Sequence, residues 1–140
     1  MSPSRPLLLL IEDDVDDVYF FHRAIAKMEL DCDLEAARDG EAALQRLKRE
    51  PRPTHVLLDL KIPRMPGIEV LRWIRATAGF QSLPVIVLTS SNEKADLVRA
   101  KELGIDAYLL KPVGFSLLLD AVRRIAETWK IPSIPPPGSP

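Results

Sequence analysis

The sequence predicts an α/β protein whose parallel sheet is covered by helices on both faces. Short apolar segments alternate with stretches of helical spacing, and this strand–helix order recurs five times in 140 residues. Repeated units of this length favour a parallel sheet with right-handed crossovers. Glycines at positions 40, 67, 104 and 114 mark changes between segments. The length suits one globular domain, so a two-domain enzyme is not expected.

Five segments are predicted to be strands because each is short, rich in aliphatic side chains and bounded by polar or turn residues. They are residues 7–11, 34–37, 55–58, 85–88 and 107–110. The segment 34–37 is the most polar, which suits a strand at or near a sheet edge. The helices predicted between and after them cover residues 15–27, 41–49, 68–78, 92–103 and 116–129. Asp13 or Asp14 is expected to cap the first helix.

Charge and cysteine content exclude several classes of partner. Nineteen Lys and Arg nearly balance twenty Asp and Glu, giving a formal net charge of -1. No overall basic field therefore draws the chain to nucleic acid or to an anionic membrane. Cys32 is the single cysteine and cannot form an internal disulfide, which favours a cytoplasmic location. The apolar run 7–11 is far too short to span a bilayer.

Prolines indicate where the folded domain ends. Five of the thirteen prolines fall among the last nine residues, so we expect one domain over residues 1–131 and a Pro-rich tail over 132–140. No effector domain is expected after residue 131. Output would then depend on protein–protein interaction.

Polar and charged residues follow four of the predicted strands. Ligands of open parallel sheets gather at the carboxyl ends of the strands. The residues at these ends are Glu12 and Asp13 after the first strand, Asp59 after the third, Thr89 after the fourth and Lys111 after the fifth. We therefore expect the chemistry of this protein at that edge of the sheet.

The carboxylates favour a hard cation. If the first and third strands are neighbours, Glu12, Asp13 and Asp59 converge, and their mutual repulsion raises a pKa unless a cation intervenes. Oxygen ligands with no His or Cys beside them suit Mg²⁺ better than zinc. Asp59 has no helix close behind it to cap, because prolines at positions 63 and 66 hold the following segment as a loop.

Three further acidic residues are better explained as part of a helix start than as metal ligands. These are Asp14, Asp16 and Asp17, which lie where the first helix is predicted to begin.

Thr89 and Lys111 add a hydroxyl and an ammonium that a metal site alone does not need. Pro112 restricts the backbone that holds Lys111. A carboxylate nucleophile, a cation, a hydroxyl and a lysine are the parts that phosphoryl transfer requires.

Four motifs together resemble the receiver domain of response regulators in two-component signalling. They are Leu-Ile-Glu-Asp-Asp at 10–14, Leu-Leu-Asp-Leu-Lys-Ile-Pro at 57–63 followed by Met-Pro-Gly at 65–67, Val-Leu-Thr-Ser at 87–90, and Ala-Tyr-Leu-Leu-Lys-Pro at 107–112. Each is common alone, but all four in this order are highly specific, and the resemblance covers residues 7–131. It implies a (βα)5 flavodoxin-like receiver fold with strand order 2-1-3-4-5. It also implies that the chain is a phosphoacceptor signalling protein rather than an enzyme. Its own reactions would be only Mg²⁺-dependent self-phosphorylation and autodephosphorylation.

The resemblance assigns roles to individual residues. Asp59 matches the phosphoacceptor, and Asp13 with Asp59 would bind Mg²⁺ directly, while Glu12 would act through water. The backbone carbonyl of Lys61 would complete the protein ligands. Thr89 matches the switch hydroxyl, and Lys111 the lysine that contacts the phosphoryl group.

Tyr108 matches the aromatic residue that changes rotamer on activation. The peptide before Pro112 is cis in many relatives, and proline makes that geometry accessible here.

Within the family, the chain is most similar to single-domain regulators paired with bacterial phytochrome kinases. The residues that suggest this are 12–14, 89–92 and the tail that follows Trp129. The implied partner is a sensor histidine kinase, with a bacteriophytochrome as the candidate. Phe20 and Phe21 lie on the first helix, the expected kinase-docking surface, and their spacing prevents both from facing the same part of the core.

The last predicted helix carries more apolar residues than one buried face requires. Phe115, Leu119 and Trp129 are therefore predicted to form a homodimer face, the alternative being that they cover only their own core.

Three rival functions share parts of this pattern. A haloacid-dehalogenase-like phosphatase needs a second aspartate where this chain has Lys61, and a flavodoxin-like carrier needs a phosphate cradle where this chain is acidic. A receiver-like scaffold that works without phosphorylation remains an alternative.

Overall fold

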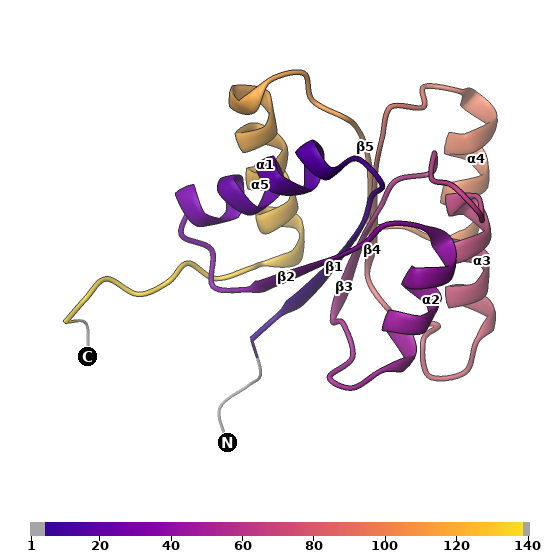
Figure 1. Ribbon diagram of the computed structural model, residues 1–140, viewed down its shortest axis with the longest axis horizontal. Coiled ribbons are helices and arrows are strands. Elements are labelled where there is room, and N and C mark those ends of the chain that lie inside the picture. The colour runs from indigo at the N-terminus through magenta and orange to yellow at the C-terminus, as the bar shows by residue number, and fades with distance from the viewer. Residues whose placement is uncertain (1–4, 139–140) are drawn as a thin grey trace.

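A computed structural model describes residues 5–138, and its elements alternate strictly between strand and helix (Figure 1). The strands are β1 (Leu7–Ile11), β2 (Asp33–Ala37), β3 (His55–Leu58), β4 (Val85–Thr89) and β5 (Ala107–Leu110). The helices are α1 (Val15–Lys27), α2 (Gly40–Lys48), α3 (Gly67–Ala76), α4 (Lys94–Leu103) and α5 (Phe115–Trp129). The predicted elements are all present, and their ends differ from the predictions by at most two residues.

The five strands form one parallel sheet in the order β2-β1-β3-β4-β5. This confirms the predicted fold class and strand order, including the edge position of the polar strand β2. The register pairs Ile11 with Leu58 and Thr89 with Leu110. The carboxyl ends of β1 and β3 are therefore level with each other, as are those of β4 and β5, which brings the residues after them to one edge.

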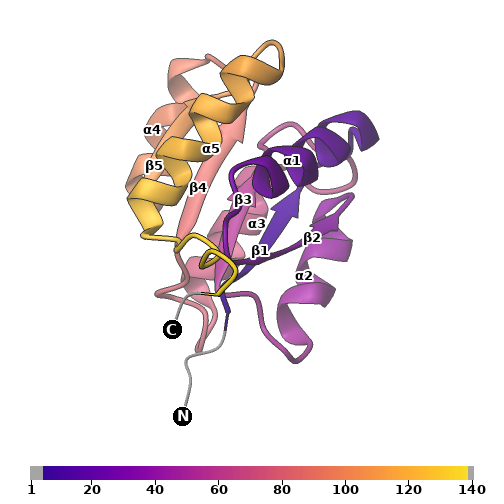
Figure 2. The ribbon, with the colours of Figure 1, turned by 90° about the vertical axis from the view of Figure 1, so that its left-hand side faces the viewer.

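Helices cover both faces of the sheet, with α1 and α5 on one face and α2, α3 and α4 on the other (Figures 1 and 2). Leu8 and Leu10 of β1 belong to the core beneath α1 and α5, whereas Leu9 and Ile11 belong to the core beneath the other three helices. Side chains alternate between the faces of a strand, so a strand covered on both faces must be apolar throughout. This explains the continuous aliphatic runs in the sequence.

Local contacts fix where α1 begins and how β3 continues. The Asp14 side chain accepts hydrogen bonds from the backbone N–H groups of Asp16 and Asp17, which confirms Asp14 as the cap of α1. A Cβ atom at Gly67 would lie 2.4 Å from the carbonyl oxygen of Asp59. Only glycine allows α3 to start this close to the chain that carries Asp59.

The loop after β5 differs from the expectation drawn from relatives. Within residues 5–138 the cis peptide bond is Glu50–Pro51, so the Lys111–Pro112 bond is trans.

The first residues of the predicted tail pack against the domain. The backbone N–H of Asp31 donates to Pro132 at 2.7 Å, and the N–H of Ile134 donates to Glu29 at 2.7 Å. Leu30 and Ser133 form an antiparallel bridge. Backbone pairing therefore continues beyond residue 131, the predicted end of the domain. No helix in the described residues is long and apolar enough to cross a membrane.

His55 and Trp129 meet at the opposite edge of the sheet from the strand ends described above. Their ring centroids are 4.6 Å apart, and the Trp129 indole N–H donates to Asp106 at 2.7 Å. Burial lowers the pKa of His55, although the negative charge of Asp106 opposes that shift. The unfolded chain therefore holds the His55 proton to higher pH than the folded chain does.

This difference predicts a pH effect on stability. Because the folded pKa is depressed, the neutral His55 imidazole favours folding above its unfolded pKa, and this stability is lost as pH falls through the folded pKa. His55→Asn should therefore flatten the rise in the free energy of unfolding with pH below about pH 6.5, by less than ~1.4 kcal/mol per pH unit. Urea denaturation across this range measures the slope. His22→Asn, at an exposed position of α1, is the control, and an equal change in both variants would contradict the prediction.

Candidate functional site

The carboxyl ends of β1 and β3 bring three carboxylates together. Glu12, Asp13 and Asp59 each offer an oxygen atom, and these atoms all lie within 4.8 Å of one another. Glu12 and Asp59 are buried, with 3% and 2% of their surface exposed, whereas Asp13 is exposed. This set of hard oxygen donors, open to solvent on one side, fits a divalent cation that retains water ligands.

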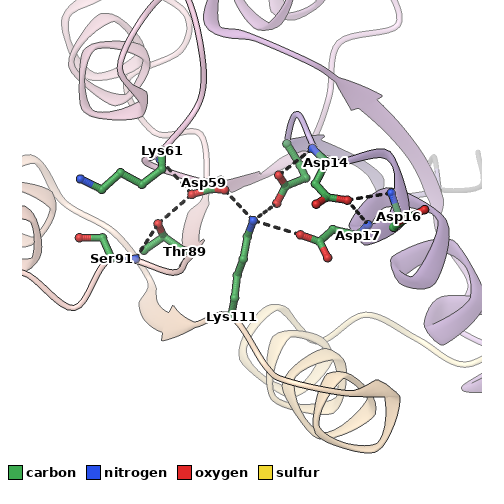
Figure 3. A network of polar contacts seen from close by, with 9 residues as sticks. Asp14, Asp16, Asp17, Asp59, Lys61, Thr89, Ser91 and Lys111 are labelled. Atoms are coloured by element: carbon green, nitrogen blue, oxygen red, sulfur yellow. Dashed lines mark hydrogen bonds and ion pairs between the residues drawn. The ribbon is translucent and has the colours of Figure 1, made fainter.

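Asp59 is held by contacts from the ends of β4 and β5 and from its own loop (Figure 3). Its Oδ1 accepts a hydrogen bond from the Thr89 hydroxyl at 2.8 Å and another from the backbone N–H of Lys61 at 2.9 Å. Its Oδ2 lies 2.8 Å from Nζ of Lys111. The predicted acceptor, hydroxyl and lysine are therefore in direct contact, and both carboxylate oxygens have fixed partners.

Lys111 reaches from the end of β5 into a group of carboxylates. Its Nζ lies 2.5 Å from Glu12 Oε1, 2.8 Å from Asp59 Oδ2 and 3.1 Å from Asp17 Oδ2. Burial by itself would lower the pKa of Lys111, but the hydrogen bonds to Asp59 and Glu12 outweigh it and raise the pKa above its usual value. The side chain is therefore a permanent cation at this site.

The pKa of Glu12 reflects the burial of these carboxylates. Burial raises the pKa of Glu12 to about 7, against the opposing hydrogen bonds from Lys111 and from the backbone N–H of Asp14. The negative charge of Asp59 adds to the rise. One ammonium does not fully compensate the charge of several carboxylates, so the site attracts a further cation.

Thr89 connects this group to the loop that precedes α4. The backbone N–H of Ser91 donates to the Thr89 hydroxyl at 3.3 Å, and the Tyr108 hydroxyl donates to the Ser91 carbonyl at 2.9 Å. The Ser91 hydroxyl donates in turn to Asp96 on α4 at 2.5 Å. A hydrogen-bonded chain therefore runs from Asp59 through Thr89 and Ser91 to Tyr108 and α4.

Two of the residues in these contacts were not predicted to belong to the site. Asp17 was assigned only to the start of a helix, yet it contacts Lys111, and Ser91 was assigned no role. The acidic run 12–17 placed Asp17 near the site, but which residues of a first helical turn face it depends on where the helix begins. For Ser91, the position two residues after Thr89 was the available signal.

A cavity of about 300 Å³ lies beside Lys111, between α1 and α5. Phe20, Phe21 and Phe115 are among its walls. Phe21 is buried and Phe20 is 40% exposed, as their spacing on α1 predicts. The predicted dimer residues Phe115, Leu119 and Trp129 are only partly buried, and all three pack against the core beneath α1 and α5.

Comparison with known families identifies this arrangement. The model of the response regulator receiver domain matches residues 8–123. The chain belongs to this family. The acidic pair, Asp59, Thr89 and Lys111 all lie within the matched region, and receiver domains are phosphoacceptors rather than enzymes in the usual sense.

Two relatives are similar over most of their length. The probable methanogenesis regulatory protein FilR2 of Methanothrix harundinacea is 36% identical over 128 residues, which cover 88% of this chain and 83% of that protein. The response regulator Rcp1 of Synechocystis sp. is 33% identical over 129 residues, covering 88% of each protein.

Solved structures give the same result. The phosphorylated cyanobacterial phytochrome response regulator RcpA superimposes with a TM-score of 0.84 at 28% identity, covering 91% of this chain and 95% of that one. The Mn²⁺-bound form of Rcp1 superimposes with a TM-score of 0.83 at 31% identity, covering 95% of this chain and 99% of that one. The receiver domain described here is therefore similar to phytochrome-associated response regulators.

Proposed function

We propose that Asp59 accepts a phosphoryl group from the phosphohistidine of a partner histidine kinase. A carboxylate oxygen of Asp59 attacks phosphorus, the P–N bond to the kinase histidine breaks, and the electron pair stays on that imidazole. The observation that carries the proposal is the convergence on Asp59 of the Thr89 hydroxyl, the Lys111 ammonium and the acidic pair. Phosphoryl transfer depends mainly on such positioning and charge compensation.

Glu12, Asp13, Asp59 and the backbone carbonyl of Lys61 would hold Mg²⁺. When bound, the ion supplies positive charge that reduces repulsion between the carboxylates and the incoming phosphoryl oxygens. The Mn²⁺ in the Rcp1 structure supports a divalent cation of this class. Lys111 supplies the second positive charge from the other side of Asp59.

Thr89 and Tyr108 are proposed to report phosphorylation to the rest of the domain. The Thr89 hydroxyl is fully buried and bonded to Oδ1 of Asp59, so a phosphoryl group added to Asp59 places new acceptor oxygens within its reach. Ser91 joins both residues to the start of α4. A shift of Thr89 therefore changes the hydrogen bonds that hold Tyr108, and the surface of α4, β5 and α5 follows.

The proposed partner is a sensor histidine kinase of the bacteriophytochrome class in the cytoplasm. The similarity to Rcp1 and to the phytochrome regulator RcpA supports this class. Output is proposed to occur through protein–protein interaction, with a homodimer through Phe115, Leu119 and Trp129 as one form. A phosphorylation-independent scaffold is the second candidate function. It is the weaker one, because all the residues expected for phosphorylation are present.

Phosphorylation by a small phosphodonor separates the two candidates. With acetyl phosphate and Mg²⁺, the purified chain should gain one phosphoryl group, observed in intact-protein mass spectrometry as a mass increase that hydroxylamine removes, as expected for an acyl phosphate. Removing Mg²⁺ with EDTA should slow uptake by at least tenfold, because the carboxylates then repel the donor. A chain that stays unmodified with Mg²⁺ present would support the scaffold.

A further inference from the structure

Lys111 has a carboxylate partner outside the predicted metal ligands. Asp17 Oδ2 lies 3.1 Å from Nζ of Lys111 and points toward it from α1 (Figure 3). Glu12 and Asp59, the other two partners of this ammonium, both belong to the three-carboxylate cluster, and Asp17 does not. Asp17 is therefore the partner that a metal ion bound to that cluster leaves free.

The start of α1 fixes the position of Asp17. Asp14 caps the helix by accepting the N–H groups of Asp16 at 2.9 Å and of Asp17 at 3.1 Å. Successive residues of a helix are about 100° apart around its axis, so Asp16 and Asp17 point in different directions. Within residues 5–138, the Asp16 carboxylate has no hydrogen bond or ion pair, whereas Asp17 reaches Lys111.

The partners of Lys111 range from buried to exposed. The side chains of Glu12 and Asp59 are 4% and 3% exposed, that of Lys111 is 23% exposed, and that of Asp17 is 49% exposed. A divalent cation held by Glu12 and Asp59 would compete with the ammonium for the same two carboxylates and repel it. The flexible lysine stem allows the ammonium to shift outward, and Asp17 already contacts it on that side.

We infer that Asp17 is a positioning residue that keeps Lys111 beside Asp59 while releasing Glu12 and Asp59 to the metal. This inference rests on the proposed metal site and adds a residue to it. Without the Asp17 carboxylate, the ammonium has only the metal ligands as partners. It then competes more strongly with the cation, and metal affinity falls.

Calorimetric titration with Mg²⁺ tests this inference. Asp17→Asn should weaken Mg²⁺ binding about threefold more than Asp16→Asn, as expected for loss of one half-exposed ion pair. Asp16→Asn is the matched control because it removes the same charge from the same helical turn without touching Lys111. The excess effect should disappear when both variants are made in a Lys111→Met background, because the ammonium that Asp17 holds is then gone.

The outcomes separate this inference from the proposed function. Equal weakening by Asp17→Asn and Asp16→Asn would overturn the inference alone, since only long-range charge would then matter. An excess that persists in the Lys111→Met background would also overturn it. A wild-type chain that binds no Mg²⁺ would overturn the proposed metal site, and this inference with it.

Discussion

Asp59→Asn is expected to abolish phosphoryl uptake from both a small phosphodonor and a histidine kinase. An amide is a poor nucleophile, and the carboxylate oxygen that attacks phosphorus is lost, so the initial rate should fall by roughly 10³-fold or more. The substitution leaves an oxygen that can accept the Thr89 hydroxyl, which contacts Asp59 at 2.8 Å. Intact-protein mass spectrometry with Mg²⁺ and acetyl phosphate measures the loss.

The control for this experiment is Asp14→Asn. Asp14 lies in the same acidic run but caps α1, and asparagine is an equally good cap, so uptake should stay close to that of the wild type. Far-ultraviolet circular dichroism verifies that the Asp59 variant is folded. Uptake by Asp59→Asn at the wild-type rate would show that another carboxylate, such as Asp13, is the acceptor.

The positions of the site residues could be predicted because they depend on the sheet and on little else. Once β1, β3, β4 and β5 are recognised as buried parallel strands, the next residue of each must lie at their shared carboxyl edge. The register confirms this, since Ile11 pairs with Leu58 and Thr89 with Leu110. Pattern and topology therefore suffice to bring Glu12, Asp59 and Lys111 together.

Contacts between side chains on different elements could not be predicted in the same way. Asp17 contacts Lys111 across 94 residues of sequence, and nothing in the periodicity of α1 indicates that contact. The contacts of Trp129 could not be predicted either, because an aromatic residue at the end of α5 suggests an interface with a partner. In the structure its ring packs on His55 and its indole N–H is bonded to Asp106. Such contacts depend on rotamers and on how α1 and α5 sit on the sheet.

Lys111→Met is expected to lower the stability of the metal-free chain and to strengthen metal binding. Without Mg²⁺ at pH 8, the free energy of unfolding should fall by about 1–2 kcal/mol. Glu12 and Asp59 then lose the ammonium that lies 2.5 and 2.8 Å away, while partial exposure of Lys111 keeps the loss below the ~3–5 kcal/mol of a fully buried pair. Phosphoryl uptake should also slow, because Lys111 no longer compensates the charge on the phosphoryl oxygens.

Mg²⁺ should restore stability to Lys111→Met more than it stabilises the wild type. The ammonium and the metal share Glu12 and Asp59, so removing the ammonium also removes a competitor for these ligands, and tighter binding adds to the stability of the folded state. Urea denaturation with and without Mg²⁺ measures both effects. Lys61→Met is the matched control: it removes a lysine whose ammonium lies 3.6 Å from Asp96 but keeps the Lys61 backbone N–H and carbonyl. If Mg²⁺ stabilises the Lys111 variant and the wild type equally, the metal does not use the carboxylates that Lys111 contacts, and the ligand set must lie elsewhere.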